Sequence, residues 1–173
     1  MQKINVLLAD DHTVVRQGLR ALLAAEEDIT IVGEAETGRQ AVQLAKKLLP
    51  DVVVMDIAMP LLNGLEATRQ IARETPTVRV LILSSYSDDE YVQQLTDAGA
   101  VGYLVKQSAT HDLLKAIREA HNGNAFFSPS ISKRLLERYR RAFVGGQPVK
   151  KTTDHLTSRE HEVLQLIAEG KAN

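Results

Sequence analysis

The stretch DVVVMDIAMP, residues 51–60, decides the fold of this chain. Its four apolar residues, Val52–Met55, stand between two aspartates, Asp51 and Asp56. A run that is apolar throughout, instead of alternating with polar residues, is typical of a parallel strand covered by helices on both faces. The stretch therefore predicts a buried strand with a carboxylate at its carboxyl end.

Similar short apolar runs alternate with amphipathic helical stretches on both sides of residues 51–60. Strands are expected at 4–9, 29–35, 52–55, 78–83 and 101–105, and helices at 13–26, 38–49, 65–74, 88–98 and 110–121. Proline or glycine ends four of these helices, at Pro50, Pro76, Gly99 and Gly123. Five strand–helix units predict a doubly wound α/β domain, whose ligands bind beyond the carboxyl ends of the strands.

The composition excludes several classes of protein. None of the 173 residues is cysteine, which excludes disulfide scaffolds, thiolate zinc sites and cysteine nucleophiles. No apolar run approaches the roughly 20 residues that a membrane span needs, and the amino terminus does not resemble a signal peptide. We therefore expect a soluble, cytoplasmic protein with no membrane partner.

The formal net charge of −1 conceals an uneven distribution. Residues 1–121 carry 12 Lys and Arg against 17 Asp and Glu, whereas residues 122–155 carry 7 against 2. An acidic body joined to a basic segment indicates two functional parts. A solvated helix face is the alternative explanation of the basic segment.

The strand–helix pattern stops after residue 123. We expect a loop at 126–132, an Arg-rich helix at 131–143 and a flexible linker rich in Gly, Pro, Lys and Thr at 144–155. A further helix is expected at 156–170, because Thr157 and Glu160 form a capping box.

Polar side chains that can perform chemistry follow the predicted strands. Asp10 and Asp11 follow the first strand, Asp56 the third, Ser84 and Ser85 the fourth, and Lys106 the fifth. Three carboxylates at one partly desolvated edge need a cation, and a hard divalent ion such as Mg²⁺ suits carboxylate, carbonyl and water ligands. Mg²⁺ there can neutralise a phosphoryl group that is being transferred to a carboxylate, with Ser84 and Lys106 on the remaining oxygens. The alternative is that the aspartates only cap helices, since Asp11 stands just before one.

Four segments together resemble the receiver domain of a bacterial two-component response regulator. They are ADDH (9–12), VVVMDIAMPLLNGLEATR (52–69), VLILSSYSDD (80–89) and AGAVGYLVK (98–106). The resemblance is closest to the NarL/FixJ family, whose effector is a LuxR-type helix-turn-helix domain. It implies a flavodoxin-like, five-stranded parallel sheet with strand order 2-1-3-4-5 for residues 1–123.

The same resemblance implies roles for individual residues. Asp56 would accept a phosphoryl group from a sensor histidine kinase, and Asp10, Asp11, Asp56 and the backbone carbonyl of Ala58 would hold Mg²⁺. Ser84 would be the switch hydroxyl, Tyr103 the aromatic switch and Lys106 the phosphate-binding lysine. For Tyr103, a partly buried aromatic on an edge strand is the alternative.

Neighbouring residues raise further expectations. Many receiver domains continue after this lysine with a proline in a cis peptide, but Gln107 follows Lys106 here, which puts the position of Lys106 in question. Pro60 is expected to rigidify its turn, and Gly64 to permit an unusual dihedral angle before the next helix. His12 is expected at the surface and not as a metal ligand.

Residues 156–173, LTSREHEVLQLIAEGKAN, resemble the first helix and turn of a LuxR-type DNA-binding domain. A generic amphipathic helix is the alternative. Because the second helix of such a domain reads DNA, we expect a truncated effector with no DNA-binding residue in this fragment, and DNA as a partner only of the full-length protein. The predicted domains are a receiver at 1–123, a helical and flexible linker at 124–155 and the truncated effector at 156–173.

We expect a transcriptional regulator that is controlled by phosphorylation. It would promote only its own phosphoryl transfer and aspartyl-phosphate hydrolysis, and would not be an enzyme for other substrates. A Mg²⁺-dependent phosphatase or phosphotransferase is one alternative, but such enzymes commonly carry an acid/base aspartate two residues after the nucleophile, where this chain has Ala58. A constitutive adaptor with an inactive receiver is another, and the intact set of Asp, Ser and Lys residues argues against it.

A homodimer is also expected, because three groups of apolar residues have no evident partner within the chain. They are Leu135, Leu136 and Tyr139; Val163, Leu164 and Ile167; and Tyr91 and Leu95. Exposed apolar patches usually mark contact sites. The sequence therefore predicts a monomer–dimer equilibrium that phosphorylation shifts toward the dimer.

Overall fold

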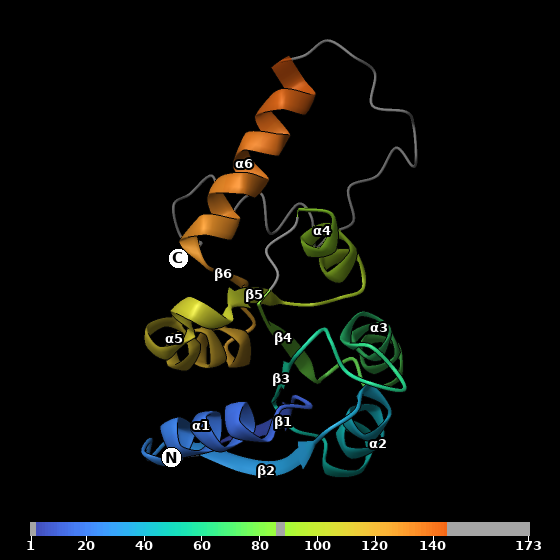
Figure 1. Cartoon of the computed structure of the whole chain (residues 1–173), viewed down its shortest axis with the longest axis vertical. Coiled ribbons are helices and arrows are strands. Elements are labelled where there is room, and N and C mark those ends of the chain that lie inside the picture. Colours follow the sequence, from blue (N-terminus) through green and yellow to red (C-terminus); the bar gives the residue numbers. More distant parts are fainter. Residues whose placement is uncertain (1–2, 86–88, 145–173) are drawn as a thin grey trace.

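The computed structural model describes residues 3–85 and 89–144, in which strands and helices alternate along the chain (Figure 1). The strands are β1 (Ile4–Ala9), β2 (Ile29–Ala35), β3 (Val52–Met55), β4 (Arg79–Ser84), β5 (Gly102–Val105) and β6 (Phe126–Phe127). The helices are α1 (Thr13–Ala24), α2 (Gly38–Leu48), α3 (Gly64–Glu74), α4 (Asp89–Asp97), α5 (Ala109–His121) and α6 (Pro129–Val144), with a short 3-10 helix, η1 (Lys106–Ser108), before α5. The linker predicted after residue 144 and the helix predicted at 156–170 lie outside the described residues.

All neighbouring strands of the sheet run parallel, in the order β2-β1-β3-β4-β5-β6. This confirms the doubly wound, flavodoxin-like α/β fold and the order of its first five strands. All four residues of β3 are buried, as its uninterrupted apolar run predicted. β2 is an edge strand, and its five middle residues are only partly buried because no further strand covers them.

Helices cover both faces of the sheet (Figure 1). On one face α1 and α5 contribute Leu23, Leu113 and Ile117 to a buried apolar cluster. On the other face α2, α3 and α4 supply a second cluster, which contains Ile71 and Leu95. Since both faces are closed, the carboxyl ends of the strands are the part of the sheet that remains for chemistry.

The structure corrects one prediction by adding a sixth strand. Residues 126–132 were expected to form a loop, but Phe126–Phe127 pairs with Gly102 and Tyr103 of β5 as β6. Successive side chains of a strand point to opposite faces, and Phe126 joins the cluster under α5 while Phe127 joins the cluster under α4. Two adjacent aromatic residues are thus buried by one short strand.

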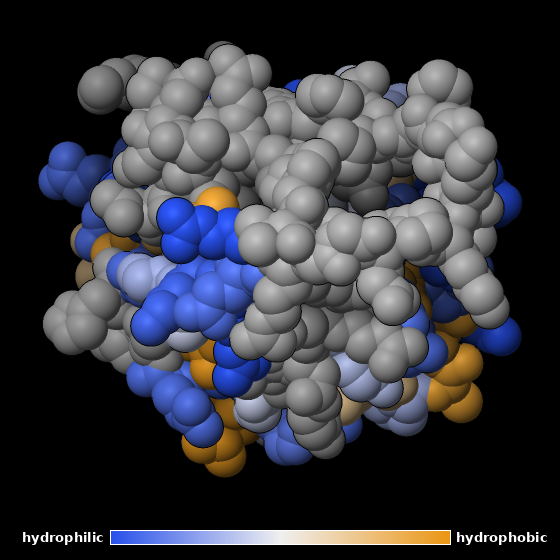
Figure 2. Space-filling model, turned by 90° about the horizontal axis from the view of Figure 1, so that it is seen from above, coloured by the Kyte–Doolittle hydropathy of each residue, from blue (hydrophilic) through white to orange (hydrophobic). Residues whose placement is uncertain are grey.

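α6 begins at Pro129, two residues earlier than the sequence predicts. Proline is favoured in the first turn of a helix, because its missing N–H would have no partner there. α6 lies beside α4 (Figure 1), and its Ile131 is 1% exposed within the same cluster as Leu95. Its exposed residues include Lys133, Arg134 and Arg140, and the described part of the face seen from above is mostly hydrophilic (Figure 2).

Two of the apolar residues predicted to lack an intramolecular partner have one. Leu95 is fully buried, and Leu135 packs against the cluster that contains it. Tyr91 and Leu136 do remain partly exposed. The predicted contact surface on α4 and α6 is therefore smaller than the sequence suggested, because the two helices cover each other. Among the described residues, no helix has both the length and the apolar character needed to cross a bilayer.

Candidate functional site

The turn after β1 carries the predicted acidic pair. The backbone N–H of Asp10 donates to the carbonyl of Ala35 at 3.1 Å, and Asp10 Oδ1 accepts from the backbone N–H of His12 at 2.8 Å. The N-cap of α1 is His12, and its side chain makes no capping hydrogen bond, so the alternative that Asp11 is the capping residue is wrong. The two carboxylates are left for another task.

Asp56 stands at the carboxyl end of β3, next to the acidic pair. Its backbone N–H donates to the carbonyl of Ala9 at 2.8 Å, which ties the end of β3 to the end of β1. Its carboxylate is 5% exposed, and Oδ1 accepts from the backbone N–H of Ile57 at 2.8 Å. The backbone of Asp56 is therefore tied to β1, and its side chain to the loop that follows β3.

Lys106 joins the two buried carboxylates from the end of β5. Its ammonium Nζ lies 2.6 Å from Asp10 Oδ2 and 3.2 Å from Asp56 Oδ2. The Lys106–Gln107 peptide is trans, and the absence of proline does not move the lysine away from the carboxylates. Residues that are far apart in the sequence thus meet at one edge of the sheet.

Burial and charge act against each other at this edge. Burial raises the pKa of Asp56 above its ordinary value, the Lys106 ammonium lowers it, and the neighbouring Asp10 raises it further, with a net upward shift. Burial lowers the pKa of Lys106, but the hydrogen bond to Asp10 and the charges of both aspartates outweigh burial and raise it. The lysine therefore stays charged at neutral pH and supports ionised carboxylates.

The same carboxylates can hold a cation. One atom each from Asp10, Asp11, His12 and Asp56 lie within 4.8 Å of one another. Asp11 Oδ1 is shielded from solvent and accepts no hydrogen bond from the described part of the chain, although the ring nitrogen Nδ1 of His12 lies 2.9 Å away. A buried acceptor without a donor is costly, and a metal ion with oxygen ligands would satisfy it. The donor set therefore fits a hard divalent cation.

His12 contacts this cluster, although its side chain is 61% exposed. Its Nδ1 lies 3.1 Å from Asp10 Oδ1 and 2.9 Å from Asp11 Oδ1. The sequence predicted only a surface position. The ring is at the surface, but it also lies at the rim of the acidic site.

Of the other predicted site residues, Ser84 and Ala58 lie at the same edge of the sheet, and Tyr103 lies within β5. Ser84 ends β4, the neighbour of β3, and is fully buried. Ala58 lies exposed in the loop after β3. Tyr103 lies in β5 and is 1% exposed, so the alternative of a partly buried edge-strand aromatic is wrong, because β6 covers the edge.

Gly64 is needed for a reason that differs from the prediction. Its φ angle is not in the left-handed region, whereas those of Gly99 and Gly123 are. A Cβ at Gly64 would lie 2.0 Å from the backbone carbonyl oxygen of Asp56, and the N–H of Gly64 donates to the carbonyl of Ile57 at 2.8 Å. Close approach of α3 to the site residue, and not an unusual dihedral angle, requires the glycine.

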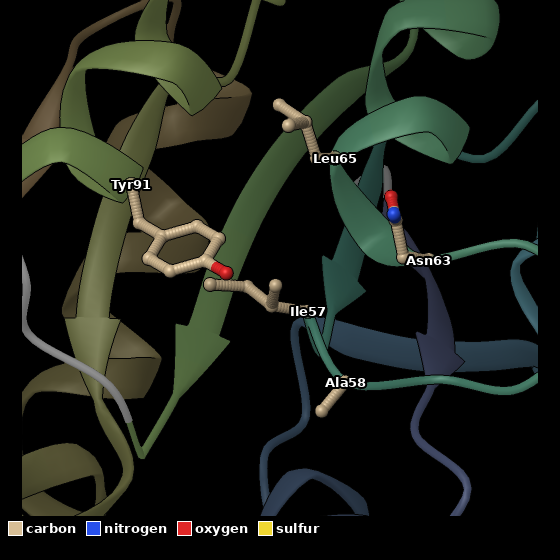
Figure 3. Close-up of a pocket in the computed structure, with 5 residues that line it drawn as sticks. All are labelled: Ile57, Ala58, Asn63, Leu65 and Tyr91. Carbon is tan, nitrogen blue, oxygen red and sulfur yellow. The ribbon is translucent and has the colours of Figure 1, made fainter.

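A small cleft opens along the loop that follows Asp56 (Figure 3). It measures about 230 Å³ and is lined by Ile57, Ala58, Asn63, Leu65 and Tyr91. Asn63 is the N-cap of α3, and its side chain accepts from the backbone N–H of Glu66 at 2.9 Å. The Tyr91 ring reaches across from α4 toward Ile57 (Figure 3). The lining is mostly apolar and contains no charged side chain, unlike the neighbouring carboxylate–lysine cluster.

Arg16 also lies next to the site, although it is not among the residues predicted from the sequence. Arg16 is 6% exposed and donates to the backbone carbonyl of Asp10 at 2.7 Å. The signal that reveals it is helical spacing, because Arg16 stands three and seven residues before Leu19 and Leu23, on the face of α1 that packs against the sheet.

Known proteins share this fold and sequence. The response regulator receiver domain family matches residues 6–118. The transcriptional regulatory protein LiaR of Bacillus subtilis is 42% identical over 170 residues, which cover 98% of this chain and 79% of LiaR. A LuxR-family two-component response regulator from Aurantimonas has a structure with a TM-score of 0.77 at 32% identity, over 80% of this chain and 99% of that one.

A third relative extends the likeness past the receiver domain. The response regulator RcsB of Salmonella typhimurium has a TM-score of 0.73 at 32% identity, over 98% of this chain and 79% of RcsB, and its structure concerns interaction with DNA. Another RcsB structure contains two dimers bound to two parallel DNAs. The family match covers more than half of the chain, and the match to LiaR covers nearly all of it. This chain therefore belongs to the NarL/LuxR family of two-component response regulators, which control transcription.

Proposed function

We propose that Asp56 is the phosphoacceptor of this response regulator and that a sensor histidine kinase is the donor. The observation that carries the proposal is the position of Lys106, whose ammonium lies between the buried carboxylates of Asp10 and Asp56. An ammonium that contacts the Asp56 carboxylate is placed to bind a phosphoryl oxygen once that carboxylate has reacted.

The reaction follows from these groups. A carboxylate oxygen of Asp56 attacks the phosphorus of a phosphohistidine, a P–O bond forms, and the P–N bond breaks. The imidazole nitrogen of the kinase leaves with the electron pair and takes up a proton. The fixed ammonium of Lys106 and the buried hydroxyl of Ser84 then stabilise the negative charge of the phosphoryl oxygens.

Mg²⁺ is the cation that we propose for the acidic site. Asp11, Asp56 and the backbone carbonyl of Ala58 would hold it directly, and Asp10 would act through water. When bound, it would neutralise charge on the transferred phosphoryl group. The support is the set of carboxylate oxygens from the three aspartates, together with Asp11 Oδ1, which accepts no hydrogen bond from the described residues.

We further propose that phosphorylation draws Ser84 and then Tyr103 toward the site and changes how two chains pair. Tyr103 is buried in the cluster that also holds residues of α4 and α6, so a movement of its ring would reach both helices. This is a shift between two populated states. DNA binding would belong to the full-length protein, as the DNA-bound dimers of RcsB suggest, and the cytoplasm is where such a protein meets its kinase and its DNA.

The chain would act on no separate substrate and would catalyse only its own phosphorylation and dephosphorylation. Ala58 supports this over the phosphatase alternative, because its methyl group offers no acid or base two residues after Asp56.

Incubation with Mg²⁺ and acetyl phosphate, followed by intact-mass measurement, tests the proposal. We expect one added phosphoryl group, none after EDTA treatment, and none for Asp56→Asn, which keeps the shape but loses the nucleophilic charge. Asp51→Asn is the matched control, since Asp51 stands at the opposite end of β3, and it should be labelled like the unmodified chain. Unchanged labelling of Asp56→Asn would refute the assignment.

A further inference from the structure

Arg16 is the only basic residue that is buried in the described part of the chain. It lies in the first turn of α1, and its backbone N–H donates to the carbonyl of His12 at 3.0 Å. A buried guanidinium is stable only when it is paired and hydrogen-bonded. The groups that bond to the guanidinium of Arg16 therefore indicate its role.

The guanidinium connects the acidic turn to the end of β2. One terminal nitrogen donates to the backbone carbonyl of Asp10 at 2.7 Å, and the other donates to Glu36 Oε1 at 2.6 Å. Nε lies 3.4 Å from Glu34 Oε2, and the other oxygen of Glu34 accepts from Arg20 at 2.6 Å. The position of the guanidinium is thus set by three acceptors.

The bond to the Asp10 carbonyl has a direct geometric consequence. That carbonyl belongs to the planar peptide group that joins Asp10 to Asp11, and holding one atom of the plane restricts the direction in which both side chains project. The N–H of Asp10 is held as well, by the carbonyl of Ala35. The backbone of the acidic pair is therefore fastened on both sides, which leaves the direction of the carboxylates to be set by this backbone and by their contacts with His12 and Lys106.

We propose that Arg16 is a positioning residue, which orients the Asp10–Asp11 peptide so that its two carboxylates are preorganised for a divalent cation. The inference rests on the metal site proposed above. Groups that orient metal ligands typically affect metal affinity by about 10–100-fold when they are removed.

The direction in which Mg²⁺ affinity changes when Arg16 is replaced distinguishes a positioning role from a purely electrostatic one. Removal of a positive charge close to a cation site strengthens cation binding by Coulomb's law. A positioning role predicts the opposite, because the carboxylates lose their fixed direction. Weaker Mg²⁺ binding by a variant without the charge is therefore evidence for positioning.

The test measures Mg²⁺ affinity by calorimetry, since the chain has no tryptophan for fluorescence, together with the thermal midpoint of unfolding. For Arg16→Met we expect the dissociation constant for Mg²⁺ to rise by about tenfold. Arg118→Met is the matched control, because Arg118 bonds to Asp28 and Glu26 and lies outside the site. It should lower the thermal midpoint and leave the dissociation constant within about twofold.

A second variant covers the case in which Arg16→Met does not fold. Arg16→Lys keeps the charge but replaces the planar fork with a single ammonium, and it should also weaken Mg²⁺ binding. Unchanged affinity in whichever of the two variants folds would overturn the proposal and leave Arg16 with a purely structural role. Absence of Mg²⁺ binding by the unmodified chain is a different result, which would instead refute the proposed metal site.

Discussion

A carboxylate that accepts a phosphoryl group has to be ionised, although the protein covers it. For Asp56, the proposed phosphoacceptor, the neighbouring Lys106 ammonium favours the charged form. Burial raises the pKa of Asp56, and the Lys106 ammonium at 3.2 Å acts in the opposite direction. The site therefore contains a charge that the fold does not favour, which is a common feature of functional sites.

Asp56→Asn is predicted to stabilise the chain at neutral pH. Because the folded-state pKa of Asp56 lies above its ordinary value of 3.8, the folded chain binds this proton more tightly than the unfolded chain. The contribution of this group to stability is present below pH 3.8 and is lost as the pH rises through the folded-state pKa. We expect Asp56→Asn to gain about 1 kcal/mol at pH 7 without divalent cations, and less at low pH. Urea unfolding at several pH values checks this, and a gain that grows as the pH falls would contradict it.

Gly64→Ala is predicted to destabilise the chain. The new Cβ would lie 2.0 Å from the carbonyl oxygen of Asp56, which is backbone and cannot turn aside. We expect a loss of about 2–3 kcal/mol in the free energy of unfolding. Gly18→Ala is the control, because Gly18 lies in α1 with no atom near its added Cβ, and it should gain up to about 1 kcal/mol. Equal effects of the two substitutions in urea unfolding would show that close packing at Gly64 is not the reason.

At the scale of secondary structure, β6 and α6 extend the receiver fold. The backbone N–H of Ser128 donates to the carbonyl of Tyr103 at 3.0 Å, directly before α6 begins. Ile131 then joins the cluster that contains Tyr103 and Leu95. The segment between the receiver and the rest of the protein is therefore packed on the element that carries the predicted aromatic switch.

Ile131→Ala is predicted to loosen α6. Ile131 is 1% exposed, and truncation of a buried isoleucine costs about 2–5 kcal/mol. Because α6 packs at one side of the molecule, we expect its amide hydrogens to exchange faster while those of β3 keep their protection. Leu136→Ala is the control, since Leu136 is 38% exposed and should change stability by less than about 0.5 kcal/mol. Hydrogen exchange followed by mass spectrometry measures both, and equal protection of α6 in the two variants would contradict the prediction.

At the scale of the whole molecule, the structure decides how dimer formation should be tested. A chain shortened to end at Asn122, close to the predicted end of the receiver domain, would lack Phe126, Phe127 and Ile131. These residues are buried against β5, α4 and α5. Such a chain would expose part of its core and associate for that reason alone. Truncation after Val144, the last residue of α6, avoids the problem.

We predict that the chain shifts toward a dimer when a beryllium fluoride complex mimics the phosphoryl group. Sedimentation of the whole chain and of the chain truncated after Val144, with and without the mimic, measures this. If residues 1–144 are sufficient, both chains should respond alike. Chains that stay monomeric in all four measurements would refute the dimer prediction, and a response confined to the whole chain would assign the contact to residues after 144.

The sequence by itself determined the class of fold, the places of five strands and the order in which Asp10, Asp56 and Lys106 follow them. These features depend on local patterns, since an apolar run of four residues, a helical period of apolar residues and a terminating glycine or proline act within one element. Because the carboxyl ends of parallel strands lie at one edge of the sheet, these charged residues are expected to lie close together.

Only the tertiary structure decided what covers each element. It showed that Phe126 and Phe127 form a strand, that Leu95 is buried in a cluster shared with Ile131 of α6, and that a close backbone contact requires Gly64. It also placed the guanidinium of Arg16 against the carbonyl of Asp10. The physical reason is that periodicity along a chain shows which face of an element is apolar, whereas the partner of that face, and of each buried charge, is set by contacts between residues distant in the sequence.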